Sequence, residues 1–232
     1  MRQDKILEFE KQIGYQFENT DLLVTALTHS SYSNEKRLHK YECNERLEFL
    51  GDAVLELVSS EYIFQHNPKK PEGDLTRIRA SYVCEPTLAL CAREIHLGEY
   101  ILLGKGEDMT GGRDRDSILS DAMEATIGAV YLDGGFQRAK EYIEHFILKD
   151  IEKKKLFYDS KTFLQEIIQR EHDSLEYVLL SEQGPDHNKI FNVGVVIDGT
   201  QIAEASGRTK KKAEQAAAYE AILKLEAKDK RG

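Results

Sequence analysis

The side chains best suited to chemistry are carboxylates on two segments far apart in the sequence. In the first segment, Tyr41–Ser60, no proline interrupts a set of apolar residues at helical spacing: Leu47, Leu50, Val54, Leu57 and Val58. A helix turns by about 100° per residue, so four acids fall within about 80° of one another on the opposite face: Glu45, Glu48, Asp52 and Glu56. Such neighbours repel by roughly a few tenths of a kcal/mol per pair, and a bound cation would reverse the repulsion.

The second segment, 118–135, is apolar on nearly every side and predicts a buried helix, with Ser117 as its cap and Gly134-Gly135 at its end. It nevertheless contains Asp121 and Glu124, three residues apart. Buried carboxylates are rare unless they are paired or bind a metal. If the two helices face each other, their carboxylates converge.

No His or Cys joins these acids, and a ligand set made only of oxygen favours Mg²⁺ or Mn²⁺ over zinc. Such an ion could activate a water and neutralise the charge of a phosphodiester. The spacing alone leaves a second interpretation open, in which the carboxylates form a solvated acidic face. Phe49 lies on the carboxylate side of the first helix, away from its other apolar residues, and this position predicts contact with another surface.

Composition limits the class of protein. The chain has 232 residues, 41% hydrophobic and 31% charged, which suits a soluble globular protein. The sequence contains no run of eighteen apolar residues, so we expect no membrane span. The charged N-terminus also lacks the apolar core of a signal peptide. The three cysteines form no CxxC pair, so we expect no disulfide or zinc site and a reducing cytoplasm. The net charge of −9 by itself argues against a nucleic-acid partner, but the charges cluster locally.

The residues up to about 152 are predicted to be helical throughout, with no strand. We expect short helices over 3–12 and 22–28, a polar loop over 28–36, the acidic helix to about Gln65, a helical stretch over 75–95 capped by Asp74 and interrupted near Pro86, a mobile loop over 104–117 and a last helix over 136–154. Six histidines carry no motif and are interpreted as surface or core residues: His29, His39, His66, His96, His145 and His172.

The pattern changes at 151–160, where a shift in composition predicts a linker. Beyond it the order is α-β-β-β-α, with a helix from residue 161, strands over 175–182 and 190–198, a hairpin turn at Asp198-Gly199, a third strand and an Ala-rich helix over 209–227. The predicted boundaries are therefore a helical domain over 1–152, a linker over 153–158, a small α+β domain over 159–228 and a tail over 229–232.

The second candidate site is basic. Lys210, Lys211 and Lys212 occupy the first turn of the last helix, where each cation opposes the helix dipole by about 0.3–1 kcal/mol. This placement favours a phosphate site, although a solvated charge run is the common alternative. A domain that presents its first helix, the 184–188 loop and this turn on one side could span successive grooves of an A-form duplex.

The segment NERLEFLGDAVL (44–55) resembles the signature motif of ribonuclease III. Further segments match that family in the expected order, over essentially the whole chain: EGDLTRIRA (72–80), SILSDAMEATIGAVYLD (117–133), KTFLQE (161–166), GPDH (184–187) and RTKKKAEQAAA (208–218). The resemblance implies two domains: an all-α ribonuclease III endonuclease domain and a small α+β double-stranded-RNA-binding domain. It also implies a bacterial, cytoplasmic homodimer.

The resemblance implies roles for individual residues. It makes Glu48, Asp52, Asp121 and Glu124 the catalytic metal ligands, Glu45 and Glu72 accessory acids of the cleft, and Phe49 an aromatic that inserts into a pocket of the partner subunit. The RNA-binding residues would be the minor-groove readers Thr162, Gln165 and Glu166, the loop residues Pro185, Asp186 and His187, and the phosphate contacts Arg208, Lys210, Lys211 and Lys212.

The implied activity is Mg²⁺-dependent hydrolysis of double-stranded RNA, with Mn²⁺ as a substitute. It would leave 5′-phosphates, 3′-hydroxyls and short 3′ overhangs, in the processing of rRNA precursors, mRNA and small RNAs. Two alternatives stay open at this point. A non-catalytic double-stranded-RNA-binding protein would not need the complete carboxylate set, and a metal-dependent phosphohydrolase of small substrates would not need a separate RNA-binding domain.

Overall fold

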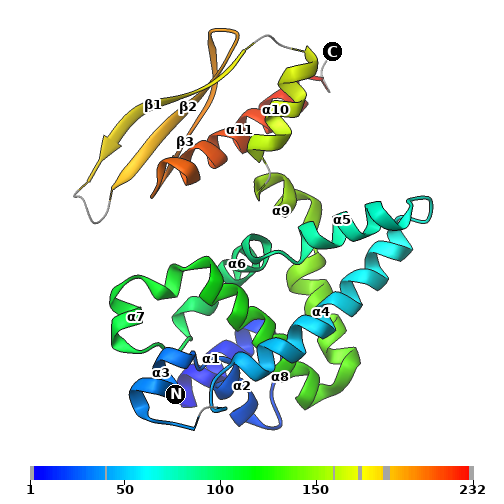
Figure 1. The fold of residues 1–232 in the computed structure, drawn as a ribbon, viewed down its shortest axis with the longest axis vertical. Coiled ribbons are helices and arrows are strands. Elements are labelled where there is room, and N and C mark those ends of the chain that lie inside the picture. Colours follow the sequence, from blue (N-terminus) through cyan, green and yellow to red (C-terminus); the bar gives the residue numbers. More distant parts are fainter. Residues whose placement is uncertain (1–2, 40, 159, 172–173, 185–188, 230–232) are drawn as a thin grey trace. The chain divides into compact units, whose positions relative to one another are not determined.

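The computed structural model describes residues 3–39, 41–158, 160–171, 174–184 and 189–229. The chain divides into two compact units, Met1–Ile151 and Glu152–Gly232 (Figure 1). Within the described residues, no helix has the length and apolar character needed to cross a membrane.

The first unit is helical, as predicted. Its α-helices are α1 (Gln3–Ile13), α2 (Thr20–Ala26), α3 (Ser30–Lys36), α4 (Glu45–His66), α5 (Glu72–Tyr82), α6 (Glu85–Glu94), α7 (Lys105–Met109) and α8 (Asp116–Ile143). Three shorter turns accompany them, the 3₁₀ helices η1 (Leu97–Glu99) and η2 (Gly112–Asp114) and the π-helix η3 (Glu144–Leu148). The predicted break near Pro86 is confirmed, because α5 ends at Tyr82 and Pro86 lies in the first turn of α6.

The prediction of a polar loop over 28–36 is wrong, because Ser30–Lys36 forms α3. The side chain of His29 caps this helix by accepting a hydrogen bond from the backbone N–H of Ser31, and Arg37 ends it in the left-handed conformation, with φ 55°. The segment has almost no apolar periodicity, so its helix depends on the cap and on tertiary contacts that a sequence pattern does not show.

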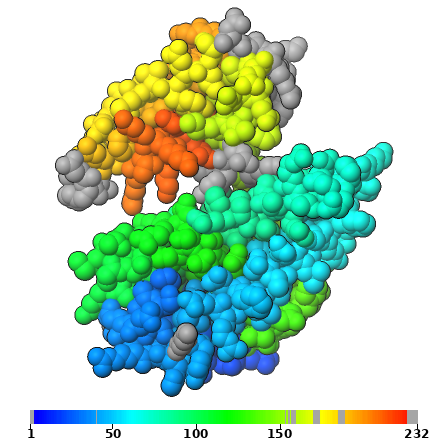
Figure 2. All heavy atoms as spheres, viewed as in Figure 1, coloured from blue at the N-terminus to red at the C-terminus, as the bar shows by residue number. Residues whose placement is uncertain are grey.

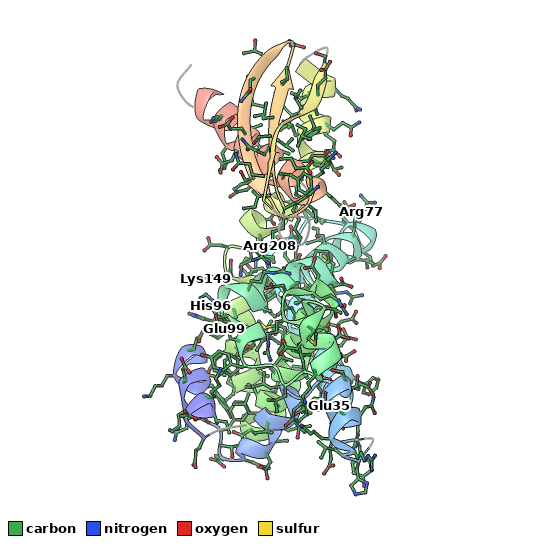
Figure 3. The ribbon with its side chains drawn as sticks, turned by 90° about the vertical axis from the view of Figure 1, so that its left-hand side faces the viewer. Glu35, Arg77, His96, Glu99, Lys149 and Arg208 are labelled. Atoms are coloured by element: carbon green, nitrogen blue, oxygen red, sulfur yellow. The ribbon has the colours of Figure 1, made fainter. Side chains whose placement is uncertain are left out.

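The 104–117 segment, predicted as a mobile loop, is instead ordered into α7, η2 and the start of α8. Two hydrogen bonds fix its beginning to α3: the backbone N–H of Gly104 donates to Ser31 Oγ at 2.9 Å, and that of Lys105 to Glu35 Oε2 at 2.7 Å. Glu35 is labelled in Figure 3. Arg113 donates to the carbonyls of Gly98 and Ile101, and these bonds hold η2 in place.

The predicted caps Asp74 and Ser117 are also wrong. The N-cap residues are Pro71 for α5 and Arg115 for α8, and neither makes a side-chain capping bond. Proline fixes φ near the value that a helix entry needs, so Asp74 falls inside the first turn.

The predicted break at Gly134-Gly135 is confirmed as a kink, with φ 78° and ψ −178° at Gly135. The chain that follows is not one helix over 136–154, because α8 continues to Ile143, η3 follows, and a separate helix α9 (Ile151–Tyr158) covers the residues expected as a linker.

Helices α4 and α8 form the centre of the first unit, and their backbones touch. A Cβ atom at Gly51 would lie 1.8 Å from the carbonyl oxygen of Glu124, and one at Gly128 would lie 2.2 Å from that of Leu47. Glycine at both positions therefore permits an approach that a side chain at either position would prevent. Leu55, Met123 and Ile127 are fully buried around this contact.

The second unit has the predicted α-β-β-β-α order. Its main elements are α10 (Ser160–Glu171), β1 (Leu175–Gln183), β2 (Ile190–Ile197), β3 (Thr200–Gly207) and α11 (Lys210–Asp229). The sheet is antiparallel in the order β1-β2-β3, with Val195 between Tyr177 and Ala203. Asp198 and Gly199 both have positive φ (48° and 75°), as the predicted two-residue hairpin requires.

One face of the sheet packs on the two helices. Val193, Val195 and Ile197 of β2 are buried as predicted, whereas Phe191 is only partly buried. Val195 and Ile197 share a core with Leu164 of α10 and with Ala217 and Ala221 of α11. The small alanines allow α11 to lie close to the sheet.

The contact at Gly51 generates a first prediction. Gly51→Ala adds a methyl group where the backbone of α8 lies, so we expect it to lower the free energy of unfolding by about 3 kcal/mol or more and to separate the carboxylates of α4 and α8. Gly73→Ala in α5 is the matched control, because nothing lies within 4 Å of a Cβ there. It should be neutral or stabilise by up to about 1 kcal/mol. Urea unfolding of both variants measures the difference, and equal stabilities would contradict the contact.

Candidate metal centre and nucleic-acid interface

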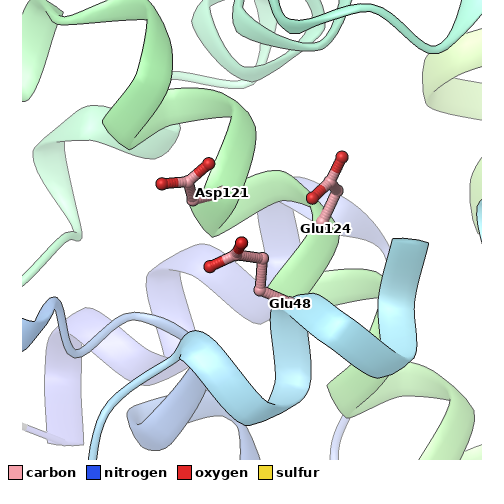
Figure 4. A group of neighbouring side chains, drawn as sticks. All are labelled: Glu48, Asp121 and Glu124. Carbon is pink, nitrogen blue, oxygen red and sulfur yellow. The ribbon is translucent and has the colours of Figure 1, made fainter.

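Three of the predicted acids form one cluster in the first unit. Carboxylate oxygens of Glu48, Asp121 and Glu124 all lie within 4.8 Å of one another, and the three residues are half-buried. Glu48 extends from α4, while Asp121 and Glu124 are one turn apart on α8 (Figure 4). The Gly51 contact determines this arrangement, because it places the backbone of Glu124 directly against α4.

The cluster binds protons more tightly than isolated carboxyls do. Burial, followed by the charges of Asp121, Glu45 and Asp52, raises the pKa of Glu48 to about 7. Burial, followed by the charges of Asp52, Glu48 and Asp121, raises the pKa of Glu124 to about 8. The pKa of Asp121 is also raised, mainly by burial. In the folded protein these carboxyls therefore keep their protons to a higher pH than ordinary carboxyls in water do.

The donor set fits a hard divalent cation. All of the atoms that converge are carboxylate oxygens, which are the ligands that Mg²⁺ and Mn²⁺ prefer. Burial and then neighbouring carboxylates disfavour the charged forms of Glu48 and Glu124 and so raise their pKa values, and a divalent ion would offset both effects. Zinc and copper sites would be expected to include His or Cys ligands.

The other predicted acids lie around this cluster or away from it. Asp52 is exposed one turn beyond Glu48 and is not among the three that converge, but its charge still raises the pKa of Glu124. Glu45 is also exposed, and its charge raises the pKa of Glu48. Glu72 begins α5, where its carboxylate accepts a hydrogen bond from Thr76 at 2.8 Å, and it lines a different pocket, of about 300 Å³, between α4 and α5.

Phe49 is 80% exposed, as its place on the helical wheel predicted. Leu57 and Phe64 of the same helix are 58% and 70% exposed. Figure 2 shows that α4 and α5, in cyan, form part of the outer surface of the first unit. An apolar stripe of this kind is typical of a surface that contacts another protein.

In the second unit, three predicted RNA-binding residues share a face. Thr162, Gln165 and Glu166 are exposed on α10, opposite the buried Leu164 and Ile168. Helix α10 is tied to α11 by an ion pair of 2.5 Å between Lys161 Nζ and Glu214 Oε2. Pro185, Asp186 and His187 lie outside the described residues.

The predicted basic turn lies at the start of α11. Arg208 precedes the helix, and Lys210, Lys211 and Lys212 occupy its first turn, all of them exposed. The hydroxyl of Thr209 accepts a hydrogen bond from the backbone N–H of Lys212 at 3.2 Å, which caps the helix. Backbone N–H groups and lysines therefore present positive charge at one end, as an anion site requires.

Two family models match the chain. Residues 19–151 match "Ribonuclease-III-like", and residues 160–225 match "Double-stranded RNA binding motif". Ribonuclease 3 of Pelotomaculum thermopropionicum is 48% identical over 226 residues, covering 96% of this chain and 94% of that protein. Ribonuclease 3 of Listeria monocytogenes is 48% identical over 221 residues, covering 94% and 96%.

The fold has a solved counterpart in the nuclease domain of ribonuclease III from Campylobacter jejuni. It is 45% identical, covers 62% of this chain and 96% of that domain, and superimposes with a TM-score of 0.58; a region of that domain is involved in dimer formation. Together with the acidic cluster and the α-β-β-β-α unit, these matches define a nuclease of double-stranded RNA. The chain belongs to the ribonuclease III family of endoribonucleases.

The sequence interpretation missed one residue beside the site. His29 carries no motif, yet the charge of its imidazole favours the ionised form of Asp121, against the larger effect of burial on the pKa of that carboxyl. The signal that could have found it is the run Thr28-His29-Ser30-Ser31, which has the composition of a helix cap rather than of a loop.

The raised pKa values predict how stability depends on pH in metal-free protein. Glu48 and Glu124 bind protons more tightly in the folded state than an ordinary glutamate, whose pKa is 4.5, so the folded state loses stability as pH rises from about 4.5 to about 8. Glu124→Gln removes one of these charges. Because solvent reaches the group, we expect it to raise the free energy of unfolding by about 1–2 kcal/mol near pH 9 and by little near pH 5.

Thermal unfolding in EDTA at the two pH values measures the effect. Glu56→Gln is the control, because Glu56 lies on the same helix as Glu48, outside the cluster of three. A Glu124→Gln variant that is no more stable than wild type near pH 9 would contradict the electrostatic account.

Proposed function

We propose that the acidic cluster is a Mg²⁺-dependent hydrolytic site for double-stranded RNA, held by Glu48, Asp52, Asp121 and Glu124, with Glu45 and Glu72 as accessory acids. The observation that carries the proposal is the convergence of oxygens from Glu48, Asp121 and Glu124 within 4.8 Å. Mn²⁺ has the same oxygen preference and would substitute. Asp52 is included because it follows Glu48 by one helical turn, on the same face of α4, and its charge raises the pKa of Glu124.

When bound, a divalent ion supplies positive charge to the phosphodiester and makes water a better nucleophile. The protein's own contribution is to hold the carboxylates of Glu48, Asp121 and Glu124 in one place, at the electrostatic cost seen in their raised pKa values. Hydrolysis adds the water oxygen to phosphorus and breaks the bond to the 3′ oxygen, which leaves a 5′-phosphate and a 3′-hydroxyl. No side chain of the cluster needs to bond to phosphorus.

The second unit would position the duplex. Thr162, Gln165 and Glu166 of α10 are suited to reading a minor groove, and the basic turn of α11 to contacting the phosphates beside it. Pro185, Asp186 and His187 would enter a second minor groove. The Lys161–Glu214 ion pair supports this arrangement, because it fixes the two helices relative to each other.

The active form would be a homodimer that joins through the exposed stripe of Phe49, Leu57 and Phe64. The involvement of a region of the C. jejuni nuclease domain in dimer formation supports this. With two sites on one duplex, each site would cut one strand and leave a short 3′ overhang. Such cuts suit the processing of rRNA precursors, mRNA and small RNAs. We place the protein in the cytoplasm, in keeping with the absence of disulfides among its three cysteines, all of which are described.

Glu124→Gln should separate binding from cleavage. The substitution removes a ligand charge without changing the shape of the side chain, so we expect duplex RNA to bind normally and the cleavage rate with Mg²⁺ to fall by about a thousandfold or more. A long RNA duplex incubated with Mg²⁺ or with EDTA and analysed on a gel measures the rate. Glu56→Gln should cleave as wild type does. Full cleavage by Glu124→Gln would remove the metal-ligand assignment.

Lys211→Glu tests the basic turn. We expect weaker duplex binding and a slope of log affinity against log salt that is smaller in magnitude by about one, because one phosphate contact is lost. The control is Lys224→Glu, farther along α11, where Lys224 donates to the carbonyl of Ile202 at 3.1 Å. If both variants keep the wild-type slope, the basic turn faces only solvent.

Phe49→Ala tests the dimer. Truncating a central aromatic of an interface commonly costs about 2 kcal/mol or more, so we expect the dimer to dissociate at protein concentrations at least about thirtyfold higher. Sedimentation velocity at several concentrations measures this. Met109→Ala provides the comparison, because Met109 is 88% exposed on α7, away from the stripe. A Phe49→Ala variant that remains dimeric at every concentration would place the interface elsewhere.

A further inference from the structure

An exposed aromatic pair lies just before the start of α4. The rings of His39 and Tyr41 are parallel, with an interplanar angle of 1° and centroids 5.4 Å apart. Both residues are exposed, and Tyr41 is 59% exposed. In a parallel pair each ring has one face turned away from the other, so the pair presents flat aromatic surface to its surroundings.

Hydrogen bonds hold the segment that carries the two rings. The backbone N–H of His39 donates to Glu42 Oε2 at 2.7 Å, and the backbone N–H of Glu42 donates to the carbonyl of His39 at 2.8 Å. The same carbonyl accepts from Ser33 Oγ of α3 at 3.4 Å. Cys43 and Asn44, which follow, are buried. The rings are therefore fixed before anything binds, and a ligand that stacks on them would lose little free energy to ordering the protein.

The pair lies close to the acidic cluster along the chain. The carbonyl of Asn44 accepts from the backbone N–H of Glu48 at 2.8 Å, so Asn44 is one helical turn before Glu48. Tyr41 precedes Asn44 by three residues, and its Cα can therefore be at most about 17 Å from that of Glu48. Nucleotides in a helical strand advance by on the order of 3 Å each. The rings are thus within reach of bases about six positions or fewer from a phosphodiester held at the cluster.

The charges around the rings favour a polyanion. The stretch KRLHKY (36–41) combines three Lys and Arg residues with the two rings. The acids on either side of it are engaged: Glu35 accepts from the backbone N–H of Lys105 at 2.7 Å, and Glu42 accepts the hydrogen bond described above. Aromatic rings among cations are typical of surfaces that bind single-stranded nucleic acid, through stacking on bases and attraction to phosphates.

The form of RNA that suits such a surface is not a continuous duplex. Inside a duplex the faces of the bases are hidden in the stack, and exposed protein rings cannot reach them. A base that has left the stack at a bulge, an internal loop or an end exposes its faces, and aromatic side chains stack on bases of this kind.

We infer that His39 and Tyr41 form a stacking platform for an unpaired nucleotide, so that the enzyme prefers RNA duplexes interrupted within about six nucleotides of the cut. The inference rests on the proposed function, because that function brings the RNA to the neighbouring acids. The platform takes no part in hydrolysis. It selects among duplexes by stacking on a base that a continuous helix does not offer.

Two RNA duplexes test the platform. They share the sequence around a mapped cut, and one carries a single unpaired adenosine, placed in turn at each of the six positions on either side of that cut. Binding is measured in EDTA and cleavage with Mg²⁺. We expect wild type to prefer the interrupted duplex at one or more of these positions. Tyr41→Ala should reduce that preference by about fivefold or more, the usual effect of losing one base–aromatic stack, and should bind the continuous duplex as wild type does.

Two variants serve as controls. Tyr41→Phe retains the ring and should keep the preference. Phe136→Ala removes a ring of α8 that is 38% exposed and should also keep it. Because Tyr41 is mostly exposed, its replacement should leave the melting temperature within a few degrees of wild type. Replacing the unpaired adenosine by 2-aminopurine gives a direct check, since its fluorescence should fall on binding to wild type and to Tyr41→Phe, and not on binding to Tyr41→Ala.

The outcomes distinguish failure of the inference from failure of the proposed function. If wild type cleaves both duplexes equally well at every position, or if Tyr41→Ala keeps the full preference, the inference fails and the proposed function stands. If wild type neither binds nor cleaves either duplex, both fail. If Tyr41→Ala changes only the sedimentation of the protein, the pair makes a contact between protein copies, and the inference is overturned.

Discussion

The structure depends on the contact between the backbones of α4 and α8 at Gly51 and Gly128. Any side chain at Gly51 would overlap the carbonyl of Glu124, and any at Gly128 would overlap that of Leu47. Two helices that meet this closely present neighbouring residues to each other at short range, so carboxylates that begin on separate helices can share one ion. The apolar core around Leu55, Met123 and Ile127 holds the pair together against the repulsion of those carboxylates.

The carboxylates that would bind a cation also destabilise the metal-free fold. The pKa values of Glu48 and Glu124, raised to about 7 and about 8, show that the metal-free fold holds its acids in an unfavourable state. The same charge would favour binding of a divalent cation at the proposed site, because the ion would offset both the repulsion between the carboxylates and their loss of solvation. The residues from Thr28 to Ser31, which carry no acid of the cluster, connect the start of α4 with the 104–117 segment through hydrogen bonds of about the usual length.

The second unit, which we propose positions the duplex, is built differently. Its three strands and two helices build a separate small core, with alanines on α11 that let the helix lie on the sheet. The core leaves the polar face of α10 and the basic turn of α11 exposed, and the Lys161–Glu214 ion pair links the two helices. The proposed phosphate contacts of the basic turn would explain how a chain of net charge −9 binds a polyanion, because local positive charge at a helix start would outweigh the average.

Helical and strand periodicity and the Asp198-Gly199 turn act over a few residues, so the amino-acid sequence alone predicts the helical first unit, the α-β-β-β-α order of the second, the acids and the exposure of Phe49. It did not determine the helix α3, the order of the 104–117 segment or the helix starts at Pro71 and Arg115, each of which depends on neighbours distant in the chain. Only the tertiary structure decided that Glu48, Asp121 and Glu124 converge while Asp52 and Glu72 lie outside that group. The physical reason is that the convergence depends on how closely two helices approach, which is set by two glycines 77 positions apart, Gly51 and Gly128, and by the core packed around them.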